Sequence, residues 1–123
     1  MSRPLVAVTH IDAMRSNLAV ARATLPDARV WAVVKADAYG HGLQNAVRAF
    51  EAADGLALVE IDRAVQLREM GWRKPILLME GLFDRSDLSI VQDYQLDSVV
   101  HCNEQLRLLA EARSGALSVH VKV

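Results

Sequence analysis

Five short apolar runs recur along this chain, and their regular spacing constrains the fold more than any other feature. They begin about 20 to 26 residues apart, and each of the first four is followed by a stretch with the periodicity of an amphipathic helix. Continuous runs of this kind are typical of strands covered on both faces of a sheet. Strands that alternate with helices at this spacing predict a parallel sheet of βαβ units. The predicted strands are 30–34, 56–59, 76–79, 96–100 and 119–123.

Helical periodicity fills the segments between these strands. An opening helix places Ile11, Met14 and Leu18 on one face, and Thr9 with Asp12 predicts a capping box at its start. Later helices are expected around 43–50, 61–70, 88–94 and 106–110. Four residues mark later helix boundaries, with starts at Ser86 and Asn103 and ends at Gly71 and Gly115.

The composition excludes several classes of protein. Apolar residues make up 52% of the 123 residues and charged residues 24%, which is typical of a globular chain. The formal net charge of −1 argues against a nucleic acid partner, because phosphate binding requires a surplus of Lys and Arg. No apolar run approaches the roughly 20 residues of a membrane helix, and Met1–Pro4 does not open a secretory signal. Cys102, the single cysteine, lacks the spacing of a zinc site. We therefore expect a cytoplasmic protein without a metal or a membrane partner.

Two α/β architectures are compatible with five strands. A complete doubly wound domain, such as a flavodoxin-like nucleotide-binding module, is one of them. The other is a (β/α)8 TIM-like barrel, which requires about 250 residues, so five parallel strands would be its N-terminal part. A nucleotide-binding module needs a Gly-rich loop after its first strand, and Ala36–Gly40 is a poor match to one. The strand pattern by itself therefore leaves both architectures open.

Lys35 is the residue that most clearly points to chemistry. It follows the first apolar strand, at the carboxyl end, where parallel α/β folds place their functional sites. A charge there is costly unless it is paired or neutralised. An uncharged amine is a nucleophile that can form a Schiff base with a carbonyl compound. The alternative is a lysine that extends from the strand end into solvent. Lys74, in a polar turn, is interpreted as a solvated loop charge.

Residues 32–42, with the sequence AVVKADAYGHG, resemble the signature of the alanine racemase family around its cofactor lysine at all eleven positions. The likeness extends over the whole chain. Two segments, Leu78–Phe83 and Val99–Cys102, are similar to the catabolic branch in particular. Other matching segments are Ile11–Leu18, Gln66–Gly71 and Pro75–Leu78.

This resemblance implies an isomerase that uses pyridoxal 5′-phosphate (PLP) to interconvert L- and D-alanine. It implies that Lys35 carries PLP as an internal aldimine and exchanges the α-proton on one face of the substrate. It also implies that Tyr39 bonds the cofactor phosphate. Lys122 matches a strand lysine that is carbamylated in several members, and its state here stays open. The structural alternatives are that Tyr39 only packs its ring, with its hydroxyl in water, and that Lys122 is an ordinary lysine on a strand edge.

The resemblance further implies a homodimer in which a tyrosine of the partner subunit, from a later β domain, is the second base. Residues 1–123 would then be the N-terminal part of a (β/α)8 TIM-like barrel domain, truncated after about five parallel strands, and inactive by themselves. The product would supply peptidoglycan synthesis or alanine breakdown, and substrates broader than alanine stay open. A non-enzymatic PLP carrier or regulator is the alternative function.

The remaining polar and aromatic residues near Lys35 are interpreted structurally. Asp37 is expected to bond loop amides, and His41 to belong to a tight glycine-containing turn. The alternative for His41 and its flanking glycines is a phosphate held at the N-terminus of the helix that begins at Leu43. Cys102 and Trp31 are expected to pack in the core.

Overall fold

The sheet contains five parallel strands in strictly sequential order. The computed structural model describes residues 3–112 and 115–123, and in that part the order is β1-β2-β3-β4-β5 with every pair parallel. A flavodoxin-like domain reverses its strand order at a switch point, so the sequential order excludes that alternative. All five predicted strands are confirmed, as β1 (Trp31–Val33), β2 (Gly55–Leu58), β3 (Ile76–Leu78), β4 (Asp97–Val100) and β5 (Val119–Val121).

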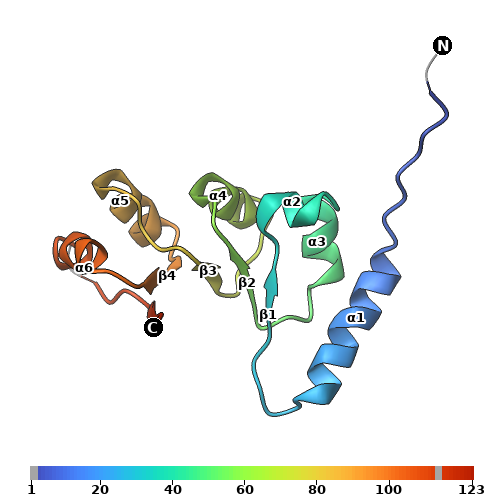
Figure 1. The fold of residues 1–123 in the computed structure, drawn as a ribbon, viewed down its shortest axis with the longest axis horizontal. Coiled ribbons are helices and arrows are strands. Elements are labelled where there is room, and N and C mark those ends of the chain that lie inside the picture. Colours follow the sequence, from blue (N-terminus) through green and yellow to red (C-terminus); the bar gives the residue numbers. More distant parts are fainter. Residues whose placement is uncertain (1–2, 113–114) are drawn as a thin grey trace.

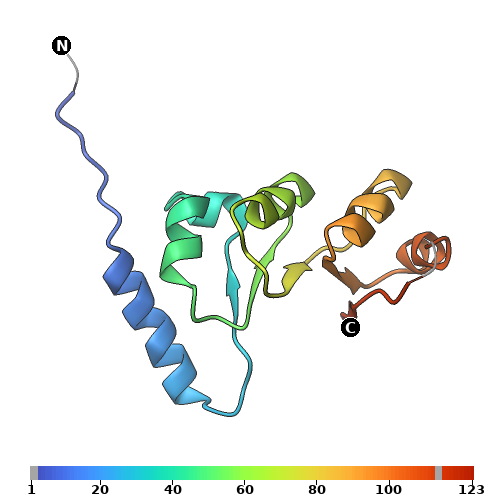
Figure 2. The same ribbon diagram turned by 180° about the vertical axis from the view of Figure 1, so that it is seen from behind.

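Helices α3 to α6 lie along one side of the strands (Figures 1 and 2). α1 packs against α3, while the described residues before α1 (3–10) extend away from the rest of the molecule (Figure 1). None of the helices in the described ranges has the length and apolar character needed to cross a membrane. The helices are α1 (Ile11–Thr24), α2 (Lys35–Tyr39), α3 (Leu43–Ala49), α4 (Ile61–Glu69), α5 (Arg85–Asp93) and α6 (Asn103–Ala110).

The sheet curls strongly, as shown by a contact between side chains of its first and fifth strands. Trp31 on β1 and His120 on β5 meet edge to face, with ring centroids 6.1 Å apart. In a flat sheet, four strand spacings would separate these strands by about 19 Å. The same indole lies over Gly55 of β2, where a Cβ would collide with its ring. Contact between β1 and β5 therefore shows the curvature of a barrel wall, with helices outside it.

The central strands form the core, and β1 differs from expectation. All four residues of β2 are buried, as are Ile76 and Leu78 of β3. In contrast, β1 is only half-buried, so the prediction that it is covered on both faces was wrong. Among the described residues β1 pairs with β2 alone, which leaves its other edge open.

Two of the predicted helix starts are also corrected. His10 is the N-cap of α1 and no side chain caps that helix, so the Thr9–Asp12 capping box was wrong. The capping box is found at α5 instead, where Asp84 accepts a hydrogen bond from the Ser86 N–H at 2.7 Å. Ser86 lies inside the first turn of that helix. A carboxylate is a strong acceptor at this position, and the serine hydroxyl was the weaker of two adjacent signals.

Lys74 is not the freely solvated charge that was predicted. Its ammonium donates to the carbonyl oxygens of Glu51 at 2.6 Å and Ala53 at 2.9 Å, and it lies 5.5 Å from the centroid of the Trp72 ring. Lys74 therefore ties the turn before β3 to the turn before β2.

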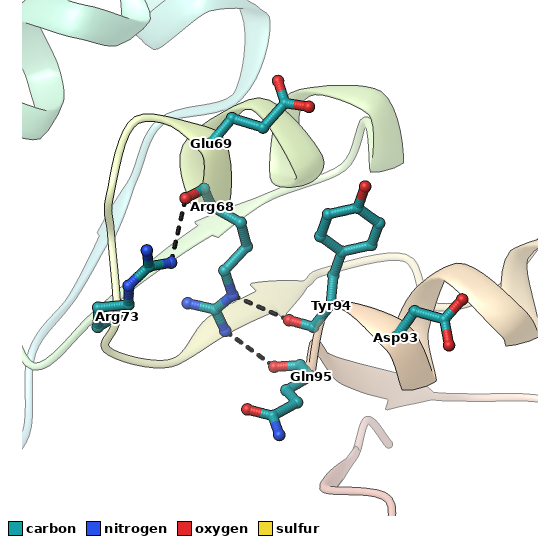
Figure 3. A pocket seen from close by; sticks show the side chains of 6 residues that line it. All are labelled: Arg68, Glu69, Arg73, Asp93, Tyr94 and Gln95. Carbon is teal, nitrogen blue, oxygen red and sulfur yellow. Dashed lines mark hydrogen bonds between the residues drawn. The ribbon is translucent and has the colours of Figure 1, made fainter.

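A single guanidinium joins the amino-terminal ends of two βα units. Arg68 on α4 donates to the carbonyls of Tyr94 (2.9 Å) and Gln95 (2.8 Å), as Figure 3 shows. It also donates to the carbonyls of Trp72 (3.0 Å) and Lys74 (2.7 Å). Burial lowers the pKa of Arg68 from its usual value. The open hollow beside it measures about 300 Å³ and is lined by Arg68, Glu69, Arg73, Asp93, Tyr94 and Gln95.

A second polar link holds the turn that precedes β2. The Asp54 carboxylate accepts from the Val30 N–H at 2.8 Å and from Arg22 Nη1 at 3.1 Å. The Val30 N–H is the main cause that lowers the pKa of Asp54 below its ordinary 3.8, with a smaller contribution from Arg22.

We predict that Asp54→Asn lowers the free energy of unfolding at neutral pH, and that the difference from the wild type shrinks in acid. The folded-state pKa is depressed, so the contribution of the ionised carboxylate is complete above 3.8 and is lost as the pH falls through the folded-state pKa. Urea titrations over a pH series measure the difference. A gap that stays constant into acid would contradict this assignment.

We predict that Arg68→Ala destabilises the protein by roughly 2 to 3 kcal/mol, because it leaves carbonyls without their charged donor. The matched control is Arg63→Ala on the same helix. Arg63 is exposed and, among the described residues, its guanidinium bonds only the Gln66 side chain, so its loss should cost far less. Equal losses in thermal unfolding would show that the four carbonyl contacts of Arg68 contribute little.

Candidate functional site

Polar residues follow each of the five strands at their carboxyl ends. Because the strands are parallel, these ends lie along one edge of the sheet, which is where α/β folds place functional groups. The hollow around Arg68 lies at the opposite edge. The residues at the carboxyl edge are Lys35 after β1, Glu60 after β2, Glu80 after β3, His101 after β4 and Lys122 after β5.

Lys35 lies where the sequence placed it, just after β1. The preceding Val34 is fully buried and its N–H donates to the Ala57 carbonyl at 2.8 Å, so the strand ladder continues up to the lysine. Lys35 itself is half-buried. Within the described residues its amine has no hydrogen bond and no ion pair. It is therefore a primary amine on a well-anchored backbone, available to an incoming group.

The chain turns left-handed directly after Lys35, which the sequence analysis did not predict. Ala36, Asp37, Ala38 and Tyr39 have φ values of 52° to 56°, and α2 is therefore a left-handed helical turn. Each residue in this conformation costs roughly 1 to 2 kcal/mol. Gly40, at φ 83°, continues the positive φ without that cost. The glycines were the only signal, since Ala and Tyr do not favour this conformation.

Contacts within the loop stabilise the end of the turn. The Asp37 carboxylate accepts from the Leu43 N–H at 2.9 Å, which confirms its predicted role in bonding loop amides. His41 Nδ1 lies 2.9 Å from the Ala38 carbonyl, so the ring belongs to the turn, as predicted. The Ala38 methyl group is buried against the core.

A carboxylate from the neighbouring βα unit holds the start of the turn. Glu60 Oε1 accepts from the Ala36 N–H at 3.1 Å, and Oε2 accepts from the Val59 N–H at 3.3 Å. Desolvation by itself would raise the pKa of Glu60. The N–H groups of Glu60 itself, Ala36 and Val59 outweigh it, and the pKa is lowered. Sequence reasoning missed Glu60 because nothing in its local pattern sets it apart from a surface glutamate.

Tyr39 closes the left-handed turn and is 60% exposed. No hydrogen bond to its hydroxyl is found among the described residues. The phenol is therefore available to a ligand at this edge, and it is not packed in the core.

Lys122 approaches the carboxylate of Glu80, with Nζ to Oε distances of 3.4 and 3.5 Å. The Glu80 loop is itself held by the buried Gln105 side chain, which donates to the carbonyls of Glu80 (2.7 Å) and Leu82 (3.2 Å). Gln105 also accepts from the His101 N–H at 2.9 Å. One amide group thus joins the loops after β3 and β4.

Two further expectations concern metals and the cysteine. The described residues contain no cluster of three His, Cys, Asp or Glu side chains able to hold a metal ion. Cys102 is a half-buried free thiol. Trp31 is half-buried and lies outside the main hydrophobic cluster of the described residues, so the expectation that it packs in the core was wrong; its indole N–H is buried and unpaired within that part of the chain.

Known proteins match both the sequence and the fold. The family model described as alanine racemase, N-terminal domain, matches residues 9–123. Alanine racemases of Janthinobacterium sp. and Ralstonia pickettii are 53% and 49% identical over all of this chain, which covers 34% and 33% of them. The chain thus spans about a third of the length of these relatives.

Solved structures agree with these sequence matches. The biosynthetic alanine racemase of Pseudomonas aeruginosa is 38% identical with a TM-score of 0.91, over 96% of this chain and 34% of that one. A histidine racemase from Leuconostoc mesenteroides is 26% identical with a TM-score of 0.74, over 89% of this chain and 30% of that one. The family match covers nearly the whole chain, and the sequential parallel strands fit it, so this chain belongs to the alanine racemase family through that family's N-terminal domain.

Proposed function

We propose that this chain is part of the N-terminal barrel domain of a PLP-dependent alanine racemase, with Lys35 as the residue that binds the cofactor covalently. The observation that carries the proposal is the state of the Lys35 amine. It lies at the carboxyl edge of the sheet, half-buried and without a hydrogen bond or ion pair in the described ranges. A buried ion pair there would have indicated a structural lysine instead.

The residues at this edge fit PLP. An aldehyde requires an accessible primary amine, which Lys35 supplies. A phosphate requires donors, and the exposed Tyr39 hydroxyl is one that no other described group occupies. When bound, PLP withdraws electrons from the α-carbon of an amino acid and so makes the α-proton removable.

Lys35 would have two tasks in such an enzyme. Its Nζ would hold the cofactor covalently through the aldehyde carbon, with the loss of one water molecule. The same primary amine, when it does not hold the cofactor, would be a base close to the α-carbon of the substrate and would hold the proton on one face. The buried Val34 and the left-handed turn that follows restrict the backbone from which this amine extends.

Racemisation also needs a proton donor or acceptor on the opposite face. Besides Tyr39, the chain has one tyrosine, Tyr94, which lies at the C-cap of α5, near the opposite edge of the sheet. We therefore propose that the second base comes from another part of the complete enzyme, as a tyrosine of the partner subunit in a homodimer. The products would be D-alanine for peptidoglycan or L-alanine for breakdown, in the cytoplasm.

The substrate range is a second question. A histidine racemase shares this fold, so the barrel edge does not by itself restrict the substrate to alanine. Racemisation assays of the full-length enzyme with alanine, serine and histidine decide this point. Binding of PLP without turnover of any amino acid would favour the carrier or regulatory alternative.

We predict that borohydride reduction of the PLP-loaded protein attaches the pyridoxyl group to Lys35, as peptide mass spectrometry would show. Lys35→Arg keeps the charge but should abolish the label, because a guanidinium does not form this bond. Lys74→Arg is the matched control. It should keep both the pyridoxyl label and the absorption band of PLP bound to the protein. Labelling mainly at another lysine would refute the assignment.

We predict that a polypeptide limited to residues 1–123 does not racemise alanine, because it offers a base on one face only. Incubation with PLP and L-alanine, followed by a D-alanine assay, measures this. Sustained turnover would show that the described residues contain a second base.

A further inference from the structure

The left-handed turn after Lys35 is unfavourable in itself, so the groups that hold it determine where the lysine points. Four successive non-glycine residues, 36–39, adopt positive φ. Asp37 and His41 stabilise the end of the turn through contacts within the same loop. The peptide that joins Lys35 to Ala36 is held from outside the loop, by Glu60.

The Ala36 N–H belongs to the peptide plane directly after the Cα of Lys35. Its hydrogen bond to Glu60 Oε1, at 3.1 Å, therefore restricts rotation about the Lys35 Cα–C bond. The other oxygen of the same carboxylate accepts from the Val59 N–H, at the end of β2. One carboxylate, from a residue 24 positions after Ala36, thus bridges the turn after β1 and the end of β2.

Glu60 lies at the start of α4, where a side chain usually caps its own helix. It is the N-cap residue of α4, yet its side chain makes no capping hydrogen bond to that helix. Ser, Thr, Asp or Asn at this position would cap α4 better than Glu does. The carboxylate bonds amides outside its own helix instead, although the residue is solvent-exposed and its charge could be satisfied by water.

We propose that Glu60 is a positioning residue for the reaction, which sets the direction in which the Lys35 side chain leaves the backbone. It does not touch the substrate or the cofactor, and it acts through the Ala36 peptide. The inference rests on the proposed function of Lys35, but the geometry of the turn can be tested without the cofactor.

The test uses Glu60→Gln in the full-length enzyme, with Asp62→Asn as the matched control. The two N–H groups bond different oxygens of the carboxylate, and the amide that replaces it presents one oxygen and one donor NH2 in their place, so one N–H group then faces a donor. Asp62 lies in the first turn of the same helix, is exposed, and bonds none of the described residues, so its variant removes the same charge without touching the turn.

In the cofactor-free protein, we expect hydrogen exchange of the Ala36 amide to become about tenfold faster in Glu60→Gln, the scale of one charge-assisted hydrogen bond. Asp62→Asn should leave it unchanged. In the loaded enzyme, the PLP dissociation constant should rise and kcat should fall more than KM changes, since substrate contacts stay intact. Unchanged exchange and PLP affinity in Glu60→Gln, or an equal effect in Asp62→Asn, would overturn the inference.

Glu60→Asp distinguishes the effect of the two hydrogen bonds from the effect of the negative charge. It also replaces Glu60→Gln in the test if that variant does not fold. It keeps the negative charge, but its side chain is one methylene shorter and cannot reach both amides. We expect the same direction of change in exchange and PLP affinity, and wild-type behaviour would overturn the bridging role. If the wild type shows no PLP absorption band, the proposed function fails, while the exchange comparison still decides whether Glu60 holds the turn.

Discussion

Parallel pairing in sequence order is the constraint on which the rest of this structure depends. Each strand bonds the next one along the chain, so every βα loop emerges at the same edge and every helix returns outside the sheet. The curl that brings Trp31 to His120 then draws these loops toward a common centre. Lys35, Glu60, Glu80 and Lys122 are distant in sequence, and only this topology places them along one edge.

Around Lys35, the molecule combines a rigid strand with an unfavourable turn. Val34 is locked into the ladder, and the next four residues after the lysine adopt left-handed conformations. Strained backbone persists only where neighbouring contacts over-determine it. Here Asp37 supplies a contact from within the loop and Glu60 one from the adjacent βα unit. The amine itself is left without a partner in the described part of the chain, so the polar contacts are concentrated on its backbone.

The strand pattern was predictable because short continuous apolar runs at this spacing are typical of buried parallel strands, and β2 is buried at every residue. The position of Lys35 followed from the same pattern. The left-handed turn was not predictable from residue preferences, since Ala36 and Tyr39 favour right-handed or extended backbone. Glu60 was missed for a different reason. Its contact depends on the pairing of β1 with β2, which no local signal encodes. The partners of Lys74 were missed for a similar reason, because the carbonyls it bonds lie 21 and 23 residues earlier in the sequence. At α5, Asp84 and Ser86 were both candidate caps, and local sequence did not choose between them.

The buried Gln105 amide has a mechanical consequence for this edge of the sheet. Its two donor contacts and one acceptor contact fasten the Glu80–Leu82 segment to the backbone at His101. A Cβ at Gly81 would collide with both the Val99 carbonyl and this amide, so there is no slack between the two segments. A displacement of α6, which carries Gln105, would therefore also move Glu80, and with it the contact between Glu80 and the Lys122 amine.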